Sequence, residues 1–135
     1  MIRAADIYEC TAIAQKMGYD PSSQCKGIIF DDLRAACLYD HWTPNSVNVH
    51  IYSNSPRDLM SPDFIQAIFS YPFEQAGLGL LIAITPADNT PSLAFSRALG
   101  FKDVCRLRDG WKIGVDLVVR EMKKEHCRWL MRKVA

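Results

Sequence analysis

The sequence predicts a domain of the α/β (α+β) class, in which helices and strands are interleaved. Apolar residues recur at helical spacing over residues 3–17, and they alternate with polar residues over 46–53 as in a strand with one buried face. A continuous apolar run at 78–85 then leads into segment 88–101, which carries helix start and stop signals. The predicted order is α-β-β-β-α-β-α-β-β, followed by a C-terminal helix.

The totals describe an ordinary globular chain. The 135 residues are enough for one domain, 1–135, and 49% hydrophobic with 23% charged residues is a typical composition. The net charge is only +1, so we expect neither a nucleic acid nor a membrane as a partner. The N-terminus has no basic stretch followed by an apolar core, so we expect no signal peptide and a cytoplasmic protein.

The cysteines predict reduced thiols. There are five, an odd number, and no two form a Cys-x-x-Cys pair. This pattern argues against a disulfide framework and against a metal site. Cys37 and Cys105 fall in predicted strands, where we expect them to be small core residues.

The first half of the chain is predicted to hold one helix and three strands. The helix over 3–17 ends at Gly18, and segments 26–30 and 33–39 form an antiparallel hairpin. The third strand, 46–53, has one core face and one face that is either wet or lines a site. The core face carries Val47, Val49 and Ile51, and the other face carries Asn48, His50 and Tyr52.

A second helix begins at Ser61. Ser61 fits the N-cap and Pro62 the first helical position, and Pro72 should end or kink the helix near Tyr71. Its buried stripe consists of Phe64, Ile65, Ile68 and Phe69.

The central segment joins the apolar strand 78–85 to a short helix. Pro91 fits the first helical position, which makes Thr90 the N-cap and leaves the amide of Asn89 free to meet something else. Gly100 can supply a left-handed C-terminal cap.

The end of the chain is predicted to be a hairpin and a helix. Strands 101–107 and 111–120 are joined at Asp109-Gly110, a favoured hairpin dipeptide. Segment 121–134 then reads as an amphipathic helix whose basic face is either solvated or meets acidic partners.

The central motif resembles one enzyme family. Asn89-Thr90-Pro91-Ser92 followed by Leu99-Gly100-Phe101 is similar to the strand, Asn-x-x-Ala/Ser helix and Leu-Gly-Phe entry of the GNAT superfamily of acyl-CoA N-acyltransferases, over roughly residues 78–121. The resemblance implies a mixed, mostly antiparallel twisted sheet of about six strands with helices on both faces, its usual first strand missing or vestigial. The alternative is an ordinary βαβ corner in which Asn89 is only a loop residue.

The resemblance also implies acetyl-CoA as cosubstrate and an amine acceptor that the sequence does not identify. In the family, a splayed strand pairs with the pantetheine arm and a helix N-terminus holds the pyrophosphate. The implied cofactor-binding residues are Val49, Ile51, Tyr52, Ser53, Arg57, Asn89 and Ser92.

The phosphate loop departs from the family pattern. Met60 and Pro62 stand where glycine and a small residue are usual, and Asp63 adds a negative charge. Arg57 is either a charged clamp that compensates or a solvated loop arginine.

Two residues are the catalytic candidates. His50 is the expected general base, since it lies mid-strand on the polar face and titrates near neutral pH; the alternative is a structural histidine. Ser96 stands where many family members carry a tyrosine that protonates the leaving thiolate, and the alternative is an exposed helix serine. Asp40 and His41 are reserve candidates for the base.

Two functions therefore remain open. The first is an acetyl-CoA-dependent N-acetyltransferase that transfers the acetyl group directly to an amine. The second is a catalytically inactive GNAT-like binding or structural module, loosely similar to short proteins of tailed phages that include virion components. Exposure of Trp111 or Trp129 would point to a homodimer.

Overall fold

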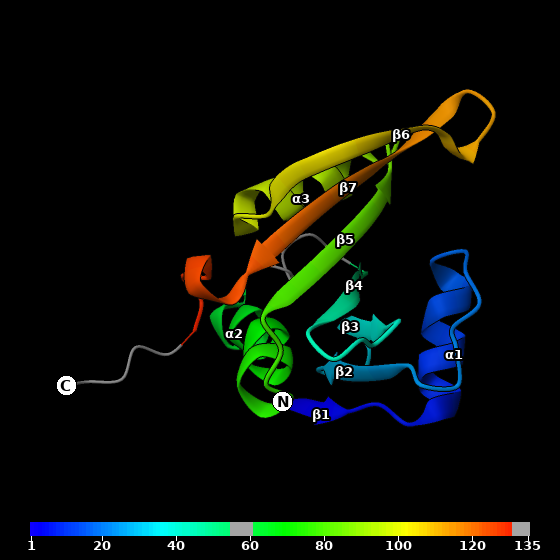
Figure 1. The fold of residues 1–135 in the computed structure, drawn as a ribbon. Coiled ribbons are helices and arrows are strands. Elements are labelled where there is room, and N and C mark those ends of the chain that lie inside the picture. The colour runs from blue at the N-terminus through cyan, green and yellow to red at the C-terminus, as the bar shows by residue number, and fades with distance from the viewer. Residues whose placement is uncertain (55–60, 131–135) are drawn as a thin grey trace.

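The protein folds around one twisted seven-stranded sheet that carries helices on both faces (Figure 1). The computed structural model describes residues 1–54 and 61–130. The strand order is β1-β2-β3-β4-β5-β7-β6, and every neighbouring pair is antiparallel except β4 with β5. The predicted mixed, mostly antiparallel sheet is confirmed.

The elements have the following bounds. The strands are β1 (Ile2–Ala4), β2 (Lys26–Phe30), β3 (Ala35–Asp40), β4 (Ser46–Ser53), β5 (Leu80–Pro86), β6 (Lys102–Lys112) and β7 (Val115–Lys123). The helices are α1 (Ile7–Lys16), α2 (Pro62–Ser70) and α3 (Thr90–Leu99), with a π-helical turn η2 (Tyr71–Gln75) and a 3₁₀ turn η3 (Lys124–His126). Within these described ranges, no helix is long and apolar enough to cross a membrane.

The N-terminus forms a first strand, which was expected to be missing or vestigial. β1 pairs with β2, so the sheet has one strand more than the six expected. The first helix starts at Ile7 rather than at Arg3 because Asp6 caps it: the Asp6 carboxylate accepts the Glu9 N–H, and the Glu9 side chain accepts the Asp6 N–H. Arg3 remains in the strand and pairs with Glu9 at 2.7 Å.

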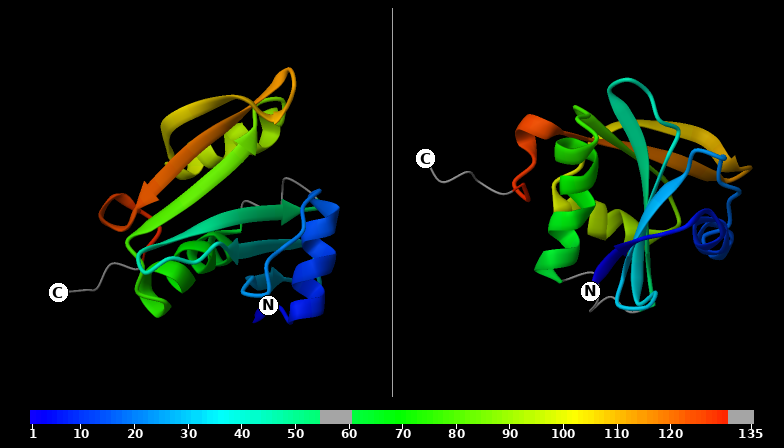
Figure 2. Two further views of the ribbon diagram at one scale, coloured as in Figure 1. Left: turned by 45° about the vertical axis from the view of Figure 1, so that its right-hand side comes forward. Right: turned by 90° about the horizontal axis from the view of Figure 1, so that it is seen from below.

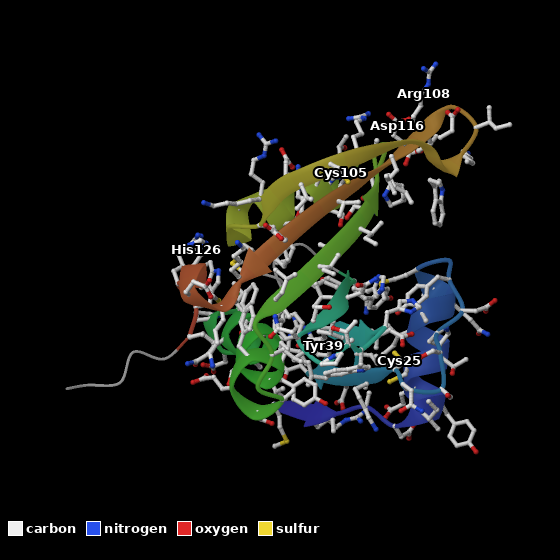
Figure 3. The ribbon with its side chains drawn as sticks, in the orientation of Figure 1. Cys25, Tyr39, Cys105, Arg108, Asp116 and His126 are labelled. Carbon is white, nitrogen blue, oxygen red and sulfur yellow. The ribbon has the colours of Figure 1, made fainter. Side chains whose placement is uncertain are left out.

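Two apolar clusters hold the helices to the sheet. α1 covers one face, where Ile13 packs with Ile29 and Leu38. α2 and α3 cover the other face (Figure 2). All four residues of the predicted α2 stripe are buried there, namely Phe64, Ile65, Ile68 and Phe69. Tyr39 lies in this second cluster and donates its hydroxyl to the Ile68 carbonyl at 2.7 Å (Figure 3).

The sheet opens between β4 and β5. β4 pairs with β3 from Asn48 to Ser53, yet it pairs with β5 over three residues only, Ser46 to Asn48. Beyond Asn48 the two strands diverge, and β5 continues into a three-stranded arm with β7 and β6 (Figure 2). The molecule is therefore built from two half-sheets, β1–β4 and β5–β7, joined at a short seam.

The end of the chain differs from the sequence prediction. Between Glu121 and Leu130 there is no α-helix, because Glu121–Lys123 complete β7 against β5. The segment after η3 turns back onto α3, where Arg128 Nη2 donates to the Ala98 carbonyl and Trp129 Nε1 to the Leu99 carbonyl. Residues 131–135 lie outside the described ranges.

The final hairpin also turns four residues later than predicted. Lys112 pairs with Val115 around Ile113-Gly114, and Gly114 has a φ of 88°. Asp109 and Gly110 instead fall in a register shift within β6. Cys105, expected in the core, is exposed on this edge strand (Figure 3). Cys37 is buried as predicted.

Candidate functional site

The open edge of β4 is the first feature of the site. The Asn54 N–H donates to the Arg34 carbonyl at 3.0 Å, and in an antiparallel pair such bonds recur at every second residue. The backbone groups of Tyr52, His50 and Asn48 thus face β3, and those of Val49 and Ile51 face the other way. The last parallel pair, Asn48 with Ile82, uses the Val49 N–H, and β5 then diverges, so the Val49 carbonyl and the Ile51 peptide groups face an edge that no described strand pairs with.

The side chains of this stretch lie on both faces. Val49 and Ile51 belong to the apolar cluster beneath α2, so only their backbone is available at the edge. Tyr52 points to the α1 face and donates its hydroxyl to Asn54 at 2.6 Å. Ser53 ends the strand. Arg57, the predicted phosphate clamp, lies outside the described residues.

The N-terminus of α3 differs from the prediction in its cap. Asn89, not Thr90, is the N-cap: its side-chain oxygen accepts the Ser92 N–H at 3.3 Å, and Thr90 and Pro91 are the first two helical residues. The idea that the Asn89 amide is not needed for capping is therefore wrong. Its NH₂ group has no hydrogen-bond partner among the residues described. Gly100 caps the other end with a φ of 106°, as predicted.

The N-terminus of α2 is already capped and carries a negative charge. Ser61 accepts the Phe64 N–H at 3.4 Å, as the sequence predicted for its N-cap. Pro62 has no N–H to offer, and Asp63 places a carboxylate in the first turn. A helix N-terminus with few free N–H groups and an added negative charge is a weak anion site.

His50 lies on the α1 face of the sheet and is half-buried, with Tyr19 against its ring. Its ring is tilted against that of Tyr19, with centroids 4.4 Å apart. His50 Nε2 and the Tyr19 hydroxyl are both sealed from solvent, without a hydrogen-bond partner in the described chain. Burial lowers the pKa of His50 to about 4, partly opposed by the charge of Asp40, so the ring is neutral at pH 7.

Asp40, a reserve candidate for the base, has a structural role. It is fully buried and accepts the Ser22 hydroxyl and backbone N–H together with the His41 N–H. Burial alone would raise its pKa, but these hydrogen bonds lower it overall. A carboxylate with three donors has little remaining capacity to take a proton.

Ser96 is buried rather than exposed. Its hydroxyl donates to the Leu93 carbonyl at 3.2 Å and accepts from Arg120 Nη1 at 2.7 Å. Arg120 is only 5% exposed and also donates from Nε to Asp103 at 2.7 Å. The hydroxyl proton is already used, so this arrangement does not favour Ser96 as a proton donor.

The sequence pattern did not single out Tyr19 and Arg120 as parts of this region. Tyr19 fell in a predicted loop, and nothing in its neighbours indicates that it would cover His50. Arg120 had a usable signal, because in the alternating strand it occupies an inward position between Val118 and Met122. A charged residue at an inward position is rarely buried without a partner, and it therefore marks a polar network.

The comparisons concern the fold. No known family model and no curated protein sequence matches the chain. Mutant forms of the spermidine/spermine N-acetyltransferase SpeG from Vibrio cholerae match with a TM-score of 0.72 at 13% identity, over 93% of this chain and 95% of that one.

Two further solved structures are similar. The Campylobacter jejuni N-acetyltransferase PseH in complex with acetyl coenzyme A matches with a TM-score of 0.63 at 16% identity, over 92% of this chain and 99% of that one. A GNAT family acetyltransferase from Bacillus anthracis matches with a TM-score of 0.61 at 17% identity, over 76% and 67%. The protein described above therefore has the fold of the GNAT acetyltransferases.

Proposed function

We propose that this protein is an N-acetyltransferase that transfers the acetyl group of acetyl-CoA directly to an amine. The observation that supports this most is the open edge of β4, where the peptide groups of Val49 and Ile51 face away from β3 just past the point where β5 diverges. An extended, amide-bearing chain such as pantetheine can pair with such an edge as an added strand does.

The residues present fit the cosubstrate in part. The backbone of Val49, Ile51 and Ser53 would hold the pantetheine arm, with Tyr52 at the strand end. Asn89 would meet it with its NH₂ group, and Ser92 lies in the first turn of the same helix. When bound, acetyl-CoA supplies an activated thioester carbonyl. The α2 N-terminus does not fit the pyrophosphate, for the reasons given above.

His50 is the general base in this proposal. An amine acceptor must lose a proton before it attacks a carbonyl, and the His50 imidazole is in its neutral, proton-accepting form at pH 7, although a pKa of about 4 makes it a weak base. The covered Nε2 and the Tyr19 hydroxyl both lack a hydrogen-bond partner in the described chain, so a water bound by both would satisfy them and connect His50 to Tyr19. Ser96 positions α3 through Arg120 and has no part in protonating the leaving group.

The test is a calorimetric titration with acetyl-CoA, made on a pair of proline variants. Ile51→Pro removes an N–H that faces the open edge, so the fold should survive, while the affinity for acetyl-CoA should fall at least about tenfold. Tyr52→Pro removes an N–H that bonds to β3, so that variant should lose much of its stability. Unchanged acetyl-CoA affinity in a folded Ile51→Pro protein would rule out pairing with β4.

The second candidate, an inactive GNAT-like module, is favoured by the α2 N-terminus. Pro62, Asp63 and the Ser61 cap leave little for a pyrophosphate to bind. The melting temperature measured with and without acetyl-CoA distinguishes the two functions, because a ligand that binds only the folded state must raise it. No shift at millimolar acetyl-CoA supports the module. A shift should be followed by chromatographic detection of CoA release with a panel of amines, because the exposed Cys105 thiol would react with thiol reagents.

A further inference from the structure

A cavity lies between α3 and the strands β6 and β7, apart from the open edge of β4. Its volume is about 630 Å³, which is within the usual range of small-molecule sites. Its polar lining comes from three elements: Arg97 of α3, Asp103 and Arg106 of β6, and Arg120 of β7. None of the residues proposed to bind acetyl-CoA lines it.

A β-bulge in the edge strand shapes this cavity. Asp103 pairs with Arg120 and Cys105 with Val119, so Val104 is an extra residue without a counterpart on β7. A bulge bends its strand and redirects the neighbouring side chains. Val104 and Cys105 both line the cavity, beneath the α3 residues Leu93 and Ala94.

The cavity carries an excess of positive charge. Three guanidinium groups and a single carboxylate, that of Asp103, line it. Asp103 pairs with Arg120, and Arg106 pairs at 2.7 Å with Asp116, which lies outside the lining. Arg97 makes no ion pair or hydrogen bond with any residue in the described part of the chain.

Arg120 is fixed in place at this site. Its guanidinium is 5% exposed and donates to Asp103, to Ser96 and to the Leu93 carbonyl. Burying a cation is costly unless such partners hold it, and the partners also fix its orientation. A guanidinium that is already oriented loses little entropy when it meets an anion.

We propose that this cavity binds a small organic carboxylate. The planar guanidinium group matches a carboxylate, and Arg97 is free to make that contact beside the fixed Arg120. The apolar part of the lining, Leu93, Ala94, Val104 and Val118, would cover a hydrocarbon body. The site is separate from the proposed acetyl-transfer site, and the inference does not rest on that function.

The experiment is an NMR titration of backbone amides with benzoate and with benzamide, its neutral isostere. Benzoate should shift the amides of Arg97 and Cys105 and saturate in the millimolar range, the affinity usual for so small a ligand. Benzamide should bind at least about tenfold more weakly, because it lacks the charge that the arginines recognise. Equal binding of both probes, or shifts confined to other parts of the chain, would overturn the proposal.

Matched variants locate the site. Arg97→Gln should weaken benzoate binding about tenfold or more, whereas Arg108→Gln should leave it unchanged. Arg108 carries the same charge but projects from the hairpin arm and does not line the cavity (Figure 3). Ala94→Phe places a ring in the cavity from the exposed face of α3 and should abolish binding with a native amide spectrum. Undiminished binding in Arg97→Gln or Ala94→Phe would contradict the site.

Discussion

The state of His50 is set by what covers it. The sequence placed a histidine that titrates near neutral pH on a polar strand face, but Tyr19 and α1 turn that face into an apolar cluster. The imidazole is neutral for this reason, and its proton-accepting form persists to low pH. The sequence does not predict the neutral state of His50, because Tyr19, which covers the ring, lies some thirty residues away in the chain.

The lowered pKa predicts how stability depends on pH. Burial lowers the pKa of His50 from 6.5 to about 4, so between these values the unfolded chain binds the extra proton and the folded one does not. The free energy of unfolding should therefore fall by up to about 3 kcal/mol as the pH drops from 6.5 to 4. Urea unfolding at pH 5 and pH 7 measures this loss.

The substitution His50→Phe should remove most of that dependence. Phe fills the same space against Tyr19 and cannot take a proton. His126→Gln is the control, since His126 is exposed and its replacement should leave the pH slope unchanged. The assignment fails if the two variants keep the same slope.

Asn89 combines two roles that substitution can separate. Asn89→Ala removes the cap of α3 and should cost about 1 kcal/mol of stability in urea unfolding. Asn89→Asp keeps an equivalent cap but loses the NH₂ group. In the proposed acetyl-CoA site, both variants should weaken acetyl-CoA binding about fivefold or more in calorimetry. Normal binding by the Asp variant would reduce Asn89 to a cap.

At the scale of elements, the α2 N-terminus predicts opposite changes in stability and binding. Asp63 favours the helix, because a negative charge in the first turn is worth about 0.3–1 kcal/mol. Asp63→Asn should therefore lower the melting temperature slightly, yet strengthen acetyl-CoA binding roughly fivefold by removing repulsion of the pyrophosphate. Glu74→Gln, at the other end of the same helical segment, changes the net charge equally and should leave acetyl-CoA binding unaltered.

Elements with strong local signals were predictable and those decided by distant contacts were not. The strand over Ser46–Ser53 and the Ser61-Pro62 helix start were confirmed. The helix predicted beyond Glu121 was wrong, because Glu121–Lys123 pair with β5, a strand forty residues earlier. A helical pattern of charges does not outweigh an available sheet edge. The divergence of β4 from β5 has no local signal, and it entered the prediction only through the family resemblance.

Across the whole molecule, the C-terminal segment fastens the end of β7 to the end of α3. Trp129 donates from its indole to the Leu99 carbonyl at 2.8 Å. The Arg128 guanidinium lies 4.4 Å from the centre of the Trp129 ring and donates to the Ala98 carbonyl. Both contacts satisfy carbonyls at the end of α3 that have no partner within the helix.

Replacing the indole tests this contact. Trp129→Phe keeps an aromatic ring but removes the donor, and it should lower the free energy of unfolding by about 1 kcal/mol, or a few degrees of melting temperature. Trp111→Phe is the control, because Trp111 is 48% exposed on the hairpin arm and no hydrogen bond from its indole is seen in the described residues. Equal losses in the two variants would show that the Leu99 bond contributes nothing measurable.

The short seam between β4 and β5 has a thermal consequence. Across the seam the ladder joins only three residue pairs, and the Gly79 N–H adds one bond to the Asn45 carbonyl. Other contacts between the two halves are apolar, such as Phe69 against Phe101. Apolar packing weakens on cooling, whereas the hydrogen bonds of the ladders do not weaken in the same way. Chilled protein should thus open at this junction first, with both halves still intact on either side of it.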